Sequence, residues 1–192
     1  MATRNFCATK SEYHCNPRRY TARIKQSCGG VSLILGIDVG ISGAVAVLDG
    51  GKLVDVFDMP TVTKIVSGKK RTRIDARALY ELVHVFKPDH AFIEIVAARP
   101  NQGVSSMFAF GQASGIAEGV AACVAPEVTG VRPQTWKKHF KLTSEKGKSR
   151  DLAMWQWPDL KDRFKRVKDD GRAEAALIGL WGYECTLSKR PA

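Results

Sequence analysis

Two acidic residues stand inside apolar runs of this sequence, where packing alone does not explain a charge. Asp38 lies in the run 33–40 and Glu94 lies in the run 90–96, and both runs are typical of buried β-strands. Burying an unpaired carboxylate costs on the order of several kcal/mol, so each acid requires a partner. A third acidic group opens the last helical segment and consists of Asp169, Asp170 and Glu174.

Divalent metal binding is the chemistry that these carboxylates favour. Asp170 and Glu174 are four residues apart and share one face of a helical turn. Asp169, one residue before Asp170, lies on the neighbouring face. If the strand of Asp38 is central, the strand of Glu94 lies beside it in parallel, and both acids meet at the carboxyl ends. Converging carboxylates raise one another's pKa, and Mg²⁺ or Mn²⁺ would neutralise them. Two such ions, about 3.5–4 Å apart, can activate water and stabilise the leaving oxygen of a phosphodiester.

Each acid also has a purely structural interpretation. Asp38 could stabilise the turn that follows its strand, and Glu94 could pair with Arg99 or His90. Asp169 and Asp170 could cap the last helix, where aspartate is favoured, and capping is compatible with catalysis. The combination of two acids in strands and an acidic cluster before a helix, in a basic protein, favours a shared site.

The segments around these acids predict a mixed α/β sheet with helices on both faces. Three strands, 33–39, 44–49 and 52–57, are separated by glycine-containing turns and form an antiparallel meander. A parallel pair needs a helical crossover, which the later segments supply. We expect a basic loop or ribbon at 59–73, a helix at 75–87 with Asp75 as N-cap, a strand at 90–96, a helix at 104–123, a strand at 127–131, and helices from 133, near 145–156 and at 172–185.

Composition points to a polyanionic partner. The chain has 192 residues, 44% of them hydrophobic, and a formal net charge of +11, so nucleic acid is the first candidate partner and an anionic membrane surface the second. Five cysteines, an odd number, favour a reducing compartment over a disulfide framework. No run predicts a membrane span or a secretory signal, and we expect an intracellular soluble protein.

Residues 1–30 differ from the rest of the chain, and we expect a disordered basic arm followed by a folded domain over 31–192. The arm is rich in Lys and Arg and has no apolar period, so it could add non-specific phosphate affinity. Three other interpretations stay open: an organelle transit peptide, a translation start near Val31, and a zinc site, which would use Cys7, His14, Cys15 and Cys28.

The order of motifs over residues 33–185 resembles RuvC-type Holliday-junction resolvases of the ribonuclease-H-like superfamily, in a style closest to phage or prophage members. The motifs are Leu35-Gly36-Ile37-Asp38-Val39-Gly40 with Ser42-Gly43-Ala44, Phe92-Ile93-Glu94, 103–112, 131–138 and 170–174. The resemblance implies an α/β, ribonuclease-H-like, five-stranded mixed sheet. It also implies a metal-dependent endodeoxyribonuclease that resolves Holliday junctions or other branched DNA by paired symmetric nicks.

In that family four acids bind two Mg²⁺ ions, with Mn²⁺ as an alternative. The resemblance assigns Asp38 and Glu94 to the first two positions and Glu174 to the last. Better-known members carry an acid or His three residues before the final acid, but position 171 is Gly here. The fourth ligand is therefore Asp170 or Asp169, and helical geometry favours Asp170.

Basic residues near the predicted site would hold the DNA. By position, Lys146 and Lys148 resemble the family's basic residues before the last helices. We expect phosphate contacts from two basic stretches, 64–77 and 132–150, and from the segment after Glu94. Our candidates are Lys69, Lys70, Arg71, Arg99, Arg132, Lys137, Lys138, Lys146 and Lys148. Phe108 and Phe110, and Trp136, Trp155 and Trp157, are predicted to be core residues rather than base-stacking ones.

The resemblance, and the need for two sites on a two-fold junction, also predict a homodimer in the cytoplasm of a bacterial or phage-infected cell. The small-residue helix 104–123 is its candidate interface. It predicts no small-molecule cofactor and no membrane partner. One rival is a non-catalytic branched-DNA-binding relative, which the complete set of acids disfavours. Another is an actin-like or sugar-kinase-type ATPase, which shares the motif 36–40; such proteins need a second similar domain, and 192 residues cannot hold two.

Overall fold

The computed structural model describes residues 32–95, 97, 103–143, 145 and 147–187. The predicted arm, residues 1–30, lies outside this range. A five-stranded sheet forms the centre, with the strand order β3-β2-β1-β6-β7. Its strands are β1 (Leu33–Asp38), β2 (Ala44–Asp49), β3 (Lys52–Asp58), β6 (His90–Glu94) and β7 (Glu127–Val131).

The strand directions confirm the predicted mixed sheet. β1 pairs antiparallel with β2, and β2 pairs antiparallel with β3, so the first three strands form the meander. β6 lies parallel to β1 on the other side, and β7 lies parallel to β6. β1 is therefore a central strand, as the position of Asp38 in an apolar run required.

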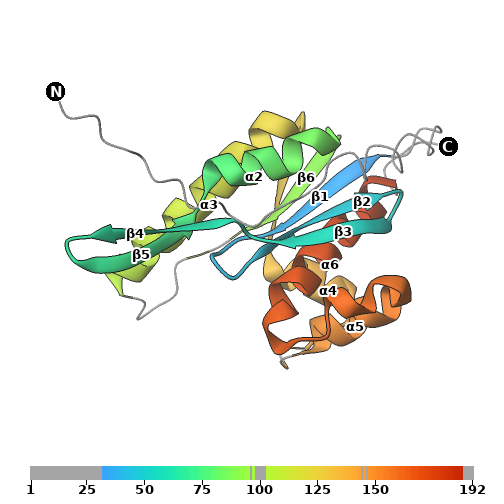
Figure 1. Ribbon diagram of the computed structural model, residues 1–192. Helices are drawn as coiled ribbons and strands as arrows, with labels where there is room; N and C mark the ends of the chain where they lie inside the picture. The colour runs from blue at the N-terminus through green and yellow to red at the C-terminus, as the bar shows by residue number, and fades with distance from the viewer. Residues whose placement is uncertain (1–31, 96, 98–102, 144, 146, 188–192) are drawn as a thin grey trace.

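Helices cover both faces of the sheet, as predicted (Figure 1). One face packs against α2 (Ala76–Val83) and α3 (Val104–Val124), through alternate residues such as Leu35 and Val47. The other face packs against α4 (Pro133–His139), α5 (Lys148–Gln156) and α6 (Asp170–Leu187). Successive residues of a strand point to opposite faces, so Asp38 shares the α6 side with Ile34 and Gly36.

Helix α6 approaches β1 at two glycines that lie against each other. A methyl group built on Gly36 would overlap the carbonyl oxygen of Ala175 and lie 2.5 Å from the nitrogen of Gly179. Only residues without a Cβ allow the two backbones this separation. The close approach fixes the start of α6 over the carboxyl end of β1.

A two-stranded ribbon, β4 (Thr61–Val66) and β5 (Lys69–Ile74), extends from the end of β3 (Figure 1). This is the segment predicted as a basic loop or ribbon. Two residues with positive φ, Ser67 at 50° and Gly68 at 73°, form its tip, which is the pattern of a type I′ hairpin turn. At its base Asp75 caps α2, as predicted, by accepting hydrogen bonds from the backbone of Arg77 and Ala78.

Three short 3₁₀ segments were not predicted: η1 (His84–Phe86), η2 (Pro158–Arg163) and η3 (Val167–Asp169). The first continues α2 within the predicted helix. The other two connect α5 to α6, and η3 ends directly at the first residue of α6. Asp169 therefore ends η3 and Asp170 begins α6, so the two neighbouring aspartates belong to different elements.

Helix α3 is long and apolar enough to cross a membrane by length and composition, which the sequence analysis did not predict. Three alanines, Ala113, Ala117 and Ala121, are buried against the sheet, so one side of α3 is a core face. Its other side is exposed, and Val104 and Phe108 are 79% and 75% accessible.

Candidate metal centre

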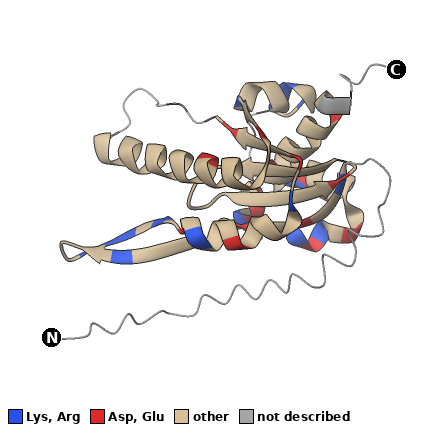
Figure 2. Ribbon diagram, turned by 90° about the horizontal axis from the view of Figure 1, so that it is seen from above, with Lys and Arg blue, Asp and Glu red and all other residues tan. Residues whose placement is uncertain are grey.

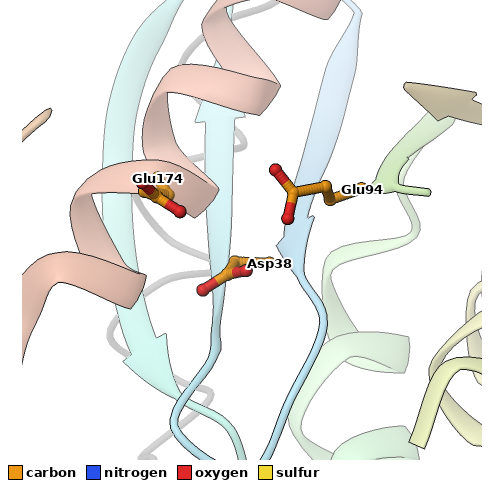
Figure 3. A group of neighbouring side chains, drawn as sticks. All are labelled: Asp38, Glu94 and Glu174. Atoms are coloured by element: carbon orange, nitrogen blue, oxygen red, sulfur yellow. The ribbon is translucent and has the colours of Figure 1, made fainter. Parts of the chain in front are cut away.

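Three of the predicted ligands come together at one end of the sheet. Asp38 ends β1, Glu94 ends β6, and Glu174 lies in the first turns of α6, and Figure 3 shows their carboxylates pointing toward one another. One carboxylate oxygen from each lies within 4.8 Å of the others. All three side chains are partly buried.

Strand register explains why Asp38 and Glu94 meet. Ile37 is paired with Ile93 in the parallel ladder of β1 and β6, so the residue after each falls at the same level and on the same face. Glu174 reaches them because α6 begins over this end of β1, where the approach of Gly36 and Gly179 holds the helix. Three elements distant in sequence therefore position one group.

The electrostatics of the group are those of a cation site. Burial raises the pKa of the Asp38 carboxyl well above its ordinary value, and the negative charges of Glu174 and Glu94 raise it further. The ammonium group of Lys137 acts in the opposite direction and lowers the pKa. A single ammonium does not balance three converging carboxylates.

Asp170 lines the same cleft. The cleft has a volume of about 490 Å³, and its walls include Asp38, Asp170 and Glu174. Nε of Arg150 donates a hydrogen bond of 2.6 Å to the carboxylate of Asp170, so this side chain is held at the edge of the cleft as an ion pair. Asp170 thus lines the cleft without joining the group of three carboxylates, and its role as the fourth ligand stays a prediction.

The structure does not bring Asp169 into the group. Its side chain is 1% exposed and accepts hydrogen bonds from both the backbone and the guanidinium of Arg166. Burial alone would raise its pKa, but the hydrogen bonds from Arg166 and the charge of Arg172 outweigh burial and lower it. Asp169 therefore has a structural role: together with Arg166 it closes the capping box of η3, and it is not the cap of the last helix that was considered above.

We expect the two aspartates to respond differently to neutralisation. Asp170→Asn should weaken Mn²⁺ binding, since the side chain lines the cleft, with little change in the free energy of unfolding. Asp169→Asn should lower that free energy by about 2 kcal/mol, because it removes charged hydrogen bonds from a buried site. Urea denaturation and calorimetric Mn²⁺ titration of both variants test this. A stable Asp169→Asn protein with weakened metal binding would restore Asp169 as the fourth ligand.

Two neighbouring residues of α4 contact the carboxylate group. Nε1 of Trp136 donates a 3.0 Å hydrogen bond to Glu94, and Nζ of Lys137 lies 3.0 Å from an oxygen of Glu174. Trp136 is fully buried, as its core assignment predicted. Lys137, predicted as a phosphate contact, belongs to the site itself, and Ser149 also donates to Glu174, at 3.4 Å.

Trp136→Phe should weaken metal binding about tenfold, since removing a group that orients a metal ligand typically costs 10- to 100-fold in affinity. The phenyl ring keeps most of the packing and loses only the N–H that orients Glu94. Calorimetric titration with Mn²⁺ gives the affinity. The matched control is Trp157→Phe, which shortens another buried tryptophan of the same hydrophobic cluster. An equal loss in both variants would mean that packing, not the hydrogen bond, sets the affinity.

Position 171 is Gly, where the resemblance led us to expect an acid or His, and the packing around it explains the difference. A methyl group at Gly171 would lie 2.5 Å from the carbonyl oxygen of Ser42 and 3.0 Å from a carboxylate oxygen of Asp38. An acid or His there would force the turn after β1 away from α6. The place beside Asp38 is thus filled by backbone, and Asp170 supplies the nearby carboxylate.

The remaining predicted DNA contacts are spread over several surfaces. Arg132 is exposed just before α4 and Lys138 is exposed on it. Lys148 is the first residue of α5, and its Nζ lies 3.6 Å from a carboxylate oxygen of Glu145. Lys69, Lys70 and Arg71 are exposed on β5. Arg99 and Lys146 lie outside the described residues. The fold alone does not show whether these side chains contact DNA, so their roles stay predictions.

Sequence reasoning missed several residues that shape the site. Phe110 lines the cleft, although it was predicted as core, and Arg150 holds Asp170. Phe108 and Trp155, also predicted as core, are 75% and 76% exposed. An aromatic residue at the right helical phase looks like a core residue in sequence even where the helix face has no neighbour, so no local signal identified these positions.

The donor set fits a divalent metal. Three carboxylates and a fourth at the rim provide only hard oxygen ligands, which Mg²⁺ and Mn²⁺ prefer. The raised pKa of Asp38 is also what is expected where a cation belongs between acids. Asp38, Glu94 and Glu174, with Asp170, are the residues that would hold such an ion.

Comparison with known proteins identifies the fold. The sequence matches no protein-family model and no curated protein. The structure of Thermus thermophilus RuvC is similar, with a TM-score of 0.51 and 15% identity over 81% of this chain and 96% of RuvC. T. thermophilus RuvC in complex with a Holliday junction (0.46, 13%, 81% and 96%) and a Fowlpox virus resolvase in complex with Holliday junction DNA (0.43, 16%, 81% and 99%) are more distant. The fold is that of RuvC and the ribonuclease-H-like proteins, as predicted.

Proposed function

We propose that this protein is a metal-dependent endonuclease that cuts branched DNA, with four-way junctions as its substrate. The observation that carries the proposal is the convergence of Asp38, Glu94 and Glu174 at the carboxyl ends of two parallel strands, beside an open cleft. A net charge of +11 supports a polyanionic substrate, and the RuvC-like fold supports the reaction class. The motifs over 33–185 support the choice of junction.

The residues around the cleft have separate roles in the proposed reaction. Asp38, Glu94, Glu174 and Asp170 would hold two Mg²⁺ or Mn²⁺ ions, which supply a water of lowered pKa and stabilise charge on the scissile phosphate. Trp136 orients Glu94, and Lys137 pairs with Glu174 at the mouth of the cleft. Residues of α4 and α5 line the cleft, and the same helices carry exposed basic residues that could hold DNA phosphates beside it.

We also propose that two copies act together, because symmetric nicking of a two-fold junction requires two sites. The exposed side of α3 is the candidate interface. Gly111, Gly115 and Gly119 share this side, and an added Cβ at each would meet open space among the described residues. Helix α3 thus offers a smooth apolar surface that another helix can approach closely, while its buried alanines attach it to the sheet.

Incubating the protein with a labelled four-way junction tests the function, with linear duplex of the same sequence as control. We expect paired nicks in Mg²⁺ or Mn²⁺, none in EDTA, and little cutting of the duplex. Analytical ultracentrifugation of the same samples should give a dimer. Junction binding without cleavage in any metal would instead identify the non-catalytic branched-DNA-binding relative.

A further inference from the structure

The ribbon β4–β5 carries an unbalanced positive charge. From Thr61 to Ile74 it contains five basic residues and no acid. Figure 2 shows this charge as blue segments on both strands. All five side chains are exposed, and among the described residues none of them forms an ion pair or a hydrogen bond. The five are Lys64, Lys69, Lys70, Arg71 and Arg73.

Strand register places four of these cations on one face. Directly opposed residues of an antiparallel pair share a face, and the faces alternate along the strands. The pairs Val62–Arg73, Lys64–Arg71 and Val66–Lys69 therefore lie on one side. The cationic face is defined here as Lys64, Lys69, Arg71 and Arg73. Lys70 is paired with Ile65 and lies on the opposite face.

The opposite face is the one that anchors the ribbon to the protein. It contains Ile74, which is buried in the cluster formed with α2 and α3, and the Thr63–Thr72 pair, whose hydroxyls are 2.9 Å apart. These contacts and the tight turn at Ser67 and Gly68 fix the register. The cationic face is thus presented on an ordered support.

Holding this face together costs free energy in the absence of a partner. Lys64 and Arg71 are directly opposed across the ribbon, and like charges at opposed positions destabilise a sheet. A row of phosphates relieves that repulsion and releases counterions at the same time. The charge pattern therefore fits a polyanion better than any other class of partner.

The cleft of the carboxylate group leads toward the base of the ribbon. A second cavity, of about 250 Å³, is lined by Thr72 and Arg73 of β5 and shares Gly40, Ile41 and Phe110 with the cleft. A nucleic acid that leaves the carboxylates in this direction reaches the ribbon next. Six residues of extended strand measure about 20 Å, and a two-stranded ribbon is narrow enough to enter a DNA major groove.

We propose that the cationic face binds the phosphate backbone of a duplex arm of the DNA substrate, outside the catalytic cleft. This inference rests on the proposed function for its ligand but concerns a separate surface. It assigns individual roles at the DNA interface to Lys64 and Arg73, which the sequence analysis included only as members of the basic stretch 64–77. It removes Lys70, a sequence-based candidate, from that interface.

Neighbouring residues on β5 provide a matched test. Binding of the full-length protein to a labelled four-way junction is measured in EDTA over a range of KCl concentrations, for Arg71→Gln, Lys64→Gln, their double variant and Lys70→Gln. Each change on the cationic face should reduce the slope of log Kd against log salt by about 0.9, and the double variant should bind about tenfold more weakly. Lys70→Gln removes the same charge one residue away and should bind like wild type.

An equal loss of junction affinity in Lys70→Gln and Arg71→Gln would overturn the proposal. It would mean that binding depends on the total charge of the ribbon and not on which face carries the charge. Unchanged junction binding by the double variant, with lost binding to anionic lipid vesicles, would overturn it in favour of a membrane surface. The failure of the proposed function looks different, since wild type would then bind DNA without cutting it in any metal. The relief of the Lys64–Arg71 repulsion means that the double variant should unfold at no lower urea concentration than wild type.

Discussion

Asp38→Asn should abolish metal-dependent cleavage and, in EDTA, make the protein more stable. Loss of a carboxylate that would hold the metal should remove several kcal/mol of transition-state stabilisation, and we expect cleavage to fall about a thousandfold. Stability should rise because the asparagine removes the buried charge that Glu174 and Glu94 repel. Adding Mn²⁺ should raise the melting temperature of the wild type and leave that of the variant unchanged.

The raised pKa of Asp38 also determines how the stability of the wild type in EDTA changes with pH. The pKa of Asp38 in the folded protein is raised above its ordinary value of 3.8, so between the two pKa values the folded state binds more protons than the unfolded state. Wild-type stability in EDTA should therefore decrease as pH rises through this window. The difference between wild type and Asp38→Asn should be largest above the folded pKa and shrink as pH falls toward 3.8.

Thermal unfolding in EDTA and in Mn²⁺, from acid to neutral pH, measures both parts of the prediction. Asp151→Asn is the matched control, since it removes an exposed carboxylate from α5 and should change neither cleavage nor the response to metal. An Asp38→Asn protein that is less stable than wild type in EDTA would show that Asp38 has a structural role. Cleavage at the wild-type rate would remove it from the catalytic site.

Gly36→Ala should have the largest effect on stability. The added methyl group would meet the backbone of Ala175 and Gly179, and neither can move unless α6 separates from β1. Overpacking against rigid backbone costs typically 1–3 kcal/mol and occasionally more, and we expect a loss of about 3 kcal/mol in the free energy of unfolding. Metal binding should weaken too, because β1 carries Asp38 and α6 carries Glu174.

Gly119→Ala on α3 is the control for the glycine-to-alanine change. A Cβ there meets open space among the described residues, and alanine is about 1 kcal/mol more favourable than glycine inside a helix. Urea denaturation at a concentration where the protein is monomeric should thus move the two midpoints in opposite directions. A Gly36→Ala protein as stable as wild type would mean that α6 does not need this close approach.

The strands and the first two acids were accessible from sequence because strand patterns are local. Apolar runs located β1 and β2, alternation located β3, and glycine turns separated them. The crossover rule placed β6 beside β1, so the meeting of Asp38 and Glu94 followed without coordinates. Helix boundaries were less accurate, since 3₁₀ turns such as η3 leave little trace in a hydrophobic pattern.

The sequence by itself determined the sheet, the order of its elements and the two strand carboxylates, because period, turns and chain connectivity act over a few residues. Tertiary structure alone decided which side chains complete the site. Trp136 meets Glu94 across 42 positions, and Lys137 meets Glu174 across 37. The different surroundings of Asp170, which lines the cleft, and of Asp169, which is held by Arg166 at η3, were likewise visible only in the folded chain. Such partners depend on how packed elements face each other, and no spacing along the chain specifies that.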